Sequence, residues 1–82
     1  MRLPRDVSGR QLAKRLATLG YVVTRQKGSH IRLSTMLGGE HHVTIPDHES
    51  LRIGTLRAIL GNVAAHFGTT INELASELFS GE

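Results

Sequence analysis

Apolar residues near the start of the chain recur at helical spacing. Leucine returns every three or four residues over Leu12–Leu19, a pattern that predicts an amphipathic helix. Ser8 is a favourable N-cap, and Gln11 three residues later completes the sequence pattern of a capping box. Gly20 supplies the left-handed residue at which helices commonly end. The pattern therefore predicts a first helix between Ser8 and Gly20.

Three segments after this helix have the character of strands. Residues 21–26 are rich in β-branched and aromatic side chains, and residues 30–34 and 41–46 alternate between apolar and polar. Gly28 lies in the first connection and Gly38-Gly39 in the second, as expected for hairpin turns. The segments predict a meander of three antiparallel strands.

The middle strand sorts its side chains onto two faces, because successive residues of a strand point to opposite sides. Ile31 and Leu33 share one face and are predicted to enter the core. His30, Arg32 and Ser34 share the other face. We expect this second face to be open to solvent.

Apolar spacing over Leu56–Val63 predicts a second helix. Gly61 weakens its interior, so its C-terminal end is expected to fray, and the connection Ala64–Thr69 is expected to be long. Thr70 and Glu73 form a second capping-box pattern before a short last helix. The fold class is predicted to be α+β, with helices on one face of a three-stranded antiparallel sheet and a short C-terminal helix.

The composition predicts a single small domain over residues 1–82 with an aliphatic core, since 39% of residues are hydrophobic but only 4% are aromatic. Cysteine is absent, which excludes disulfides and thiolate metal sites and suits a reducing cytoplasm. No apolar run has membrane-spanning length, and no signal peptide is expected.

Charge is distributed unevenly along the chain. Arg2 to Arg32 includes eight Lys or Arg residues and one acid, whereas the segment from Glu40 onward includes six acids and two arginines. A basic front half predicts a polyanionic partner, most simply nucleic acid. The alternative is a basic face that only keeps the protein soluble.

The best candidate for chemistry is His30, on the open face beside Arg32 and near Lys27 and Arg25. Histidine changes its charge near neutral pH, and fixed positive charges around it suit a substrate that carries phosphates. RNA brings its own nucleophile, the 2′-hydroxyl, so one proton-transferring group and charge stabilisation can suffice for cleavage. The alternative is an exposed strand histidine without a role.

The other histidines do not predict a metal site. His41 and His42 are adjacent in a strand, so they point to opposite faces and cannot easily share an ion. His48 follows the third strand and is a secondary candidate, because it could support the site, contact RNA or cap the turn.

Three separated motifs carry a resemblance to the HicA family of bacterial toxins. They are Gly20-Tyr21 with Arg25-Gln26-Lys27-Gly28-Ser29-His30, then Thr44-Ile45-Pro46-Asp47-His48, then Gly54-Thr55-Leu56-Arg57-Ala58-Ile59-Leu60. The resemblance covers roughly residues 8–79. It implies a fold like that of double-stranded-RNA-binding domains and a messenger-RNA interferase, that is, a metal-independent endoribonuclease without a cofactor. It also implies that His30 is the catalytic histidine and that a HicB-type antitoxin covers the site. Many relatives have a second histidine where this chain has Ile31.

The residues expected to bind RNA lie around His30 and on the first helix: Lys27, Gly28, Ser29, Arg25, Arg32, Arg10 and Lys14. For Arg10 and Lys14 the alternative is a solvated helix face. Two further classes of protein fit the same sequence. One is a non-catalytic double-stranded-RNA-binding module, which needs the charges but not the imidazole, and the other is a protein whose open face only receives a partner.

Overall fold

The chain folds in the order that its hydrophobic pattern predicts. The computed structural model describes residues 3–80. Its elements are α1 (Gly9–Leu16), the 3₁₀ turn η1 (Ala17–Leu19), β1 (Val22–Lys27), β2 (His30–Thr35), β3 (His41–Pro46), α2 (Ile53–Phe67) and α3 (Ile71–Phe79). The predicted α+β class and helix-strand-strand-strand-helix order are confirmed.

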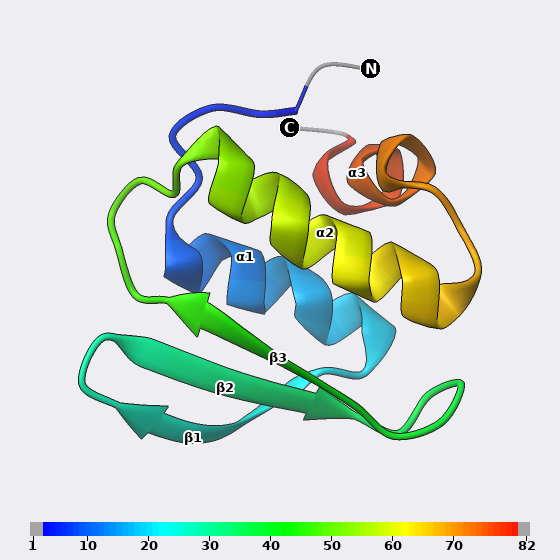
Figure 1. The fold of residues 1–82 in the computed structure, drawn as a ribbon, viewed down its shortest axis with the longest axis horizontal. Coiled ribbons are helices and arrows are strands. Elements are labelled where there is room, and N and C mark those ends of the chain that lie inside the picture. The colour runs from blue at the N-terminus through cyan, green and yellow to red at the C-terminus, as the bar shows by residue number, and fades with distance from the viewer. Residues whose placement is uncertain (1–2, 81–82) are drawn as a thin grey trace.

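The strands form one antiparallel sheet in the order β1-β2-β3. Helices α1 and α2 lie over one face of this sheet, and α3 packs on the side of these helices that faces away from the sheet (Figure 1). The other face of the sheet carries no helix (Figure 1). Among residues 3–80, no helix is both long and apolar enough to cross a membrane.

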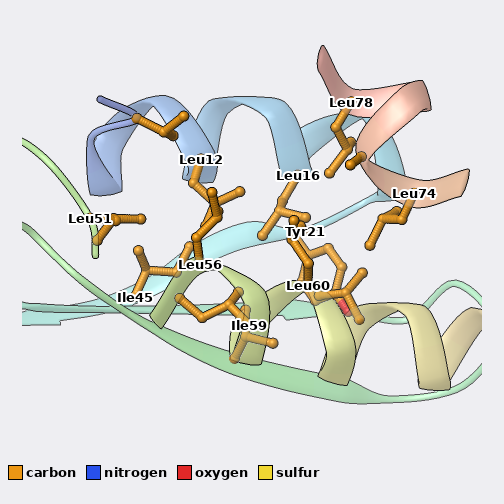
Figure 2. Packing of buried hydrophobic residues seen from close by; sticks show 14 of the residues in the cluster. Leu12, Leu16, Tyr21, Ile45, Leu51, Leu56, Ile59, Leu60, Leu74 and Leu78 are labelled. Atoms are coloured by element: carbon orange, nitrogen blue, oxygen red, sulfur yellow. The ribbon is translucent and has the colours of Figure 1, made fainter. Parts of the chain in front are cut away.

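The core is a single cluster of aliphatic side chains with one tyrosine. Leu12 and Leu16 of α1 are fully buried with Leu56 and Leu60 of α2 and Ile45 of β3, and Figure 2 shows them meeting between the helices and the sheet. Burying a side chain of this size stabilises the fold by roughly 1.5–3 kcal/mol. Because Ile31 and Leu33 of β2 and Val43 and Ile45 of β3 join this cluster, the side chains that lie between them along these strands are left on the open face.

The first helix begins as predicted. The Gln11 N–H donates to Ser8 Oγ at 3.0 Å, and the Ser8 N–H donates to Gln11 Oε1 at 2.9 Å, so the capping box is complete. The α-helix ends at Leu16, and the following 3₁₀ turn closes at Gly20, whose φ is 82°. A left-handed residue of this kind costs glycine little, which explains why the chain turns toward β1 here.

Two expectations for the C-terminal part were wrong, and a third is confirmed in part. Helix α2 continues through Gly61 to Phe67 because the residues that follow the glycine, Val63 and Ala64, are held in the core. The connection to α3 is therefore only residues 68–70. The second capping box is half formed: the Glu73 N–H donates to Thr70 Oγ1 at 3.1 Å, while the Glu73 carboxylate accepts from the Thr69 hydroxyl at 2.7 Å.

Candidate functional site

A shallow hollow of about 360 Å³ lies on the open face of the sheet. Its lining residues are Arg25, Lys27, His30, Arg32 and Thr44. In the strand register, His30 lies opposite Lys27, and Arg32 lies between Arg25 and Thr44. Side chains directly opposite one another in an antiparallel pair share a face. One imidazole is therefore grouped with three cations, and no acidic side chain lines the hollow.

A β-bulge in β1 brings two of these cations to the open face. Val23 pairs with Leu33, but the next pair is Arg25 with Arg32, so Thr24 is an extra residue in β1. Without it, simple alternation from the buried Tyr21 would place Arg25 on the helix side of the sheet. The bulge reverses the alternation for the rest of the strand, which puts Lys27 on the open face as well.

The turn before His30 is held by the loop after β3. Gly28 has a φ of 57°, as the first residue of a two-residue hairpin turn commonly requires, and no atom lies within 4 Å of where its side chain would be. The carbonyl of Ser29 accepts a hydrogen bond from the backbone N–H of Asp47 at 2.7 Å. Conformation, rather than crowding, thus explains the glycine, and Asp47 fixes the turn that precedes His30.

The Asp47 carboxylate joins α1 and β1 to this turn. It accepts two hydrogen bonds from the Arg10 guanidinium, both at 3.1 Å, and one from Gln26 Nε2 at 3.2 Å. The Arg10 hydrogen bonds hold the pKa of Asp47 below its usual value, and Asp47 in turn raises the pKa of Arg10. Asp47 was not among the predicted site residues, although the Pro46-Asp47 pair directly after a strand marks the position where a side chain can reach the turn.

The predicted site residues therefore fall into separate groups. Arg25, Lys27, His30 and Arg32 line the hollow, and Gly28 and Ser29 form the adjoining turn. Arg10 and Lys14 instead line a groove between α1 and β1. His48 is exposed and does not line the hollow; its carbonyl accepts a hydrogen bond from the Gly9 N–H at 2.9 Å.

The remaining histidines have partners away from the hollow. His41 forms a 2.7 Å hydrogen bond with the Tyr21 hydroxyl and stacks on His66 with ring centroids 4.4 Å apart. Its pKa is lowered by burial first, and then by the neighbouring charges of His66 and His42. His42 lies on the opposite side of β3 from His41 and contacts the Glu40 carboxylate at 2.7 Å. Within residues 3–80, no three His, Asp or Glu side chains are grouped so that they could hold a metal ion.

Fold and site together define a small α+β protein with a cationic hollow beside a histidine on an open sheet. The family described as HicA toxin of bacterial toxin-antitoxin matches residues 9–63. The chain belongs to this family. The matched segment includes every residue of the hollow and the Asp47 loop, and it ends within α2. No curated protein and no solved structure matches the chain. Family membership makes it a toxin of a toxin–antitoxin pair, whose partner is an antitoxin.

Proposed function

We propose that the toxin is a metal-independent endoribonuclease that cleaves messenger RNA with His30 as general acid or base. The observation that carries this proposal is the grouping of one imidazole with three cations in a hollow of the open face. A hollow lined by cations and without a carboxylate suits a polyanion. The toxin family supports an activity that harms the cell when the antitoxin is absent.

Cleavage of RNA requires from the protein only proton transfer and stabilisation of negative charge, because the nucleophile belongs to the RNA. The 2′-hydroxyl attacks the adjacent phosphorus, the bond to the 5′ oxygen breaks, one proton leaves the nucleophile and one reaches the leaving oxygen. His30 is suited to either proton transfer, because an imidazole both accepts and donates protons near neutral pH. Arg25, Lys27 and Arg32 would bind the phosphates and stabilise the charge of the phosphorane, the arginines through two parallel N–H donors.

Neighbouring residues have supporting roles in this proposal. Gly28 and Ser29 would approach the RNA backbone next to His30. Asp47 acts as a positioning residue, since its N–H holds the Ser29 carbonyl at 2.7 Å. Arg10 and Lys14 line the groove on the helix side of β1, so any RNA contact that they make lies outside the hollow around His30. His48 lies outside the hollow and stays a secondary candidate for RNA contact in this proposal.

The partner and the compartment follow from the same proposal. We propose that the antitoxin is of the HicB type and that it covers the hollow on the open face. The substrate, messenger RNA, places the activity in the cytoplasm. No small-molecule cofactor takes part, because the nucleophile comes from the substrate and the proton transfers from the protein.

The test compares three purified proteins on a single-stranded transcript of mixed sequence. We expect His30→Ala to lower the cleavage rate by about 10²–10⁴-fold while RNA affinity, measured by fluorescence anisotropy, stays within a few-fold. His42→Ala is the matched control. It removes a histidine from the same face, but one that is held by Glu40 and lies outside the hollow, so cleavage should be retained. EDTA should leave the wild-type rate unchanged.

Each other outcome has a definite meaning. Cleavage by a pure, folded His30→Ala protein would remove His30 from the mechanism. RNA binding without cleavage by the wild type would favour a non-catalytic RNA-binding module. A lack of RNA affinity at low salt would favour a protein that only binds a partner. Loss of cleavage in EDTA, restored by a divalent ion, would contradict the metal-independent mechanism.

A further inference from the structure

Strand β1 lies at the edge of the sheet and is open on one side. It pairs with β2 only (Figure 1). All six of its residues are exposed. No other strand of the described residues, 3–80, pairs with its second edge. An edge of this kind presents a row of N–H and C=O groups to which an extended segment of another chain can pair.

An apolar groove of about 470 Å³ runs beside this edge, between β1 and α1. Its apolar lining includes Ala13 of α1, Ala17 of η1, Val23 of β1 and Ile31 and Leu33 of β2. The valines of β1 are unusually open, with Val22 61% and Val23 54% exposed. Apolar surface gathered along a groove, rather than scattered singly, marks a site for an apolar ligand group or another protein.

The charges around the groove select its occupant. Neither α1 nor β1 contains an acidic residue. Lys14 of α1 lines the groove, and β1 carries Arg25 and Lys27. Two copies of the toxin paired through β1 would bring these cations together, and like charges opposite one another destabilise a sheet. RNA matches the positive charges but not the groove, because its phosphates would lie against apolar side chains. An acidic polypeptide with apolar side chains satisfies both the charge and the groove.

We propose that the antitoxin adds an extended segment to β1 as a fourth strand, with apolar and acidic side chains in alternation. Alternate side chains of that strand would enter the groove beside Val23 and Gln26, which line it from the same face of β1. The others would lie on the open face next to Arg25 and Lys27, which line the hollow around His30. Acidic residues there would offset the charges of Arg25 and Lys27, two of the three cations of the hollow.

This inference adds to the proposed function a route by which the antitoxin inhibits cleavage, and the inhibitory part rests on that function. The proposed docking of the antitoxin on β1 does not rest on the ribonuclease activity. A partner strand can remove the phosphate-binding charges of Arg25 and Lys27 without contacting the imidazole of His30. Arg25 and Lys27 on this edge then have two effects. They discourage self-association of the toxin, and they favour pairing with an acidic strand of the antitoxin.

The experiment measures binding of the antitoxin encoded beside the gene of this toxin, by calorimetry, to toxin variants that all carry His30→Ala. We expect Val23→Glu, which adds an acid to the groove, to weaken binding at least tenfold, and Val22→Glu to weaken it as well. Val23→Thr keeps the shape and should bind within threefold. Ile53→Glu alters an exposed apolar residue, 42% exposed, at the start of α2, and serves as the remote control.

Hydrogen exchange identifies the mode of binding. Adding the antitoxin should slow exchange at the outward-facing amides of residues 22–27 by tenfold or more, because a new ladder protects them. Unchanged affinity of a folded Val23→Glu protein, or unprotected β1 amides in the complex, would overturn the proposal. So would a Val23→Glu protein that loses RNA affinity and keeps the antitoxin, because RNA would then occupy the groove. Since His30 is absent from every variant, failure of the ribonuclease proposal would leave these readings unaffected.

Discussion

Replacing Gly9 with alanine tests how the first helix is joined to the site. Gly9 is buried at the start of α1, where its N–H donates to the His48 carbonyl at 2.9 Å. An added Cβ would lie 2.0 Å from the Pro46 carbonyl oxygen and 3.2 Å from the Asp47 Cα. Nonbonded heavy atoms rest at more than ~3 Å, so the helix start and the end of β3 must separate by about 1 Å.

The cost of Gly9→Ala follows from the rigidity of both sides. Overpacking costs about 1–3 kcal/mol, and a clash of backbone with backbone belongs near the upper limit of that range. Alanine returns roughly 0.4–1 kcal/mol by restricting the unfolded chain. The expected net loss is about 2 kcal/mol, from a total of roughly 4–12 kcal/mol for a chain of this length. The melting temperature should fall by about 8–16 °C.

Thermal unfolding followed by circular dichroism measures this loss. Gly54→Ala and Gly61→Ala are matched controls in α2, because a Cβ at Gly54 meets nothing within 4 Å and one at Gly61 meets only Ile71 Cδ1 at 3.6 Å. Both controls should gain about 0.5–1 kcal/mol from the better helix former. Cleavage should weaken in Gly9→Ala alone, since the clash displaces Asp47. A Gly9→Ala protein that melts at or above the wild-type temperature would refute the close contact between α1 and β3.

Two further predictions concern stability. Thr35 is buried, and its hydroxyl donates to the Leu19 carbonyl at 2.9 Å and accepts from the Leu37 N–H at 3.2 Å. Thr35→Val should therefore lower the free energy of unfolding in urea by about 1–3 kcal/mol. Thr44→Val on the open face should lower it little. The lowered pKa of His41, which packs with Tyr21 and His66, means that the unfolded chain binds the proton more tightly than the folded one. Stability should therefore be fully present above the unfolded pKa of about 6.5 and decline as the pH falls below it toward the folded pKa. His41→Gln should flatten that decline below about pH 6.5; an equally steep decline in the variant would assign it to other groups.

The parts of the fold that were predicted well depend on short-range signals. The capping box of Ser8 and Gln11, the left-handed Gly20 and the alternation around Ile31 each act within a few residues, so their physics is contained in the local sequence. The errors arose where tertiary contacts outweighed a local preference. Helix α2 passes through Gly61 because its neighbours are buried, and the Glu73 carboxylate turns to Thr69 instead of closing its box.

The candidate site divides in the same way. The sequence contains the Gly28-Ser29 turn, the open-face position of His30 and Arg32, and the motifs of the HicA family, because turn chemistry and strand alternation are local. The sequence does not predict the hydrogen bonds between Arg10 and Asp47, because the two residues are 37 positions apart. That contact exists only once α1 lies against the end of β3.

The sequence by itself determined the order of elements, the aliphatic core and the placement of one histidine on an exposed strand face. Their nearness along the chain predicted Arg25 and Lys27 close to that histidine, but only the tertiary structure decided that they lie on the same face of the sheet. Counted in steps of two from the buried Tyr21, both cations belong on the helix side of β1. They reach the open face because pairing with β2 leaves Thr24 as an extra residue, and the inserted residue reverses every position after it. Strand pairing across the sheet sets that register, and no spacing within β1 reveals it.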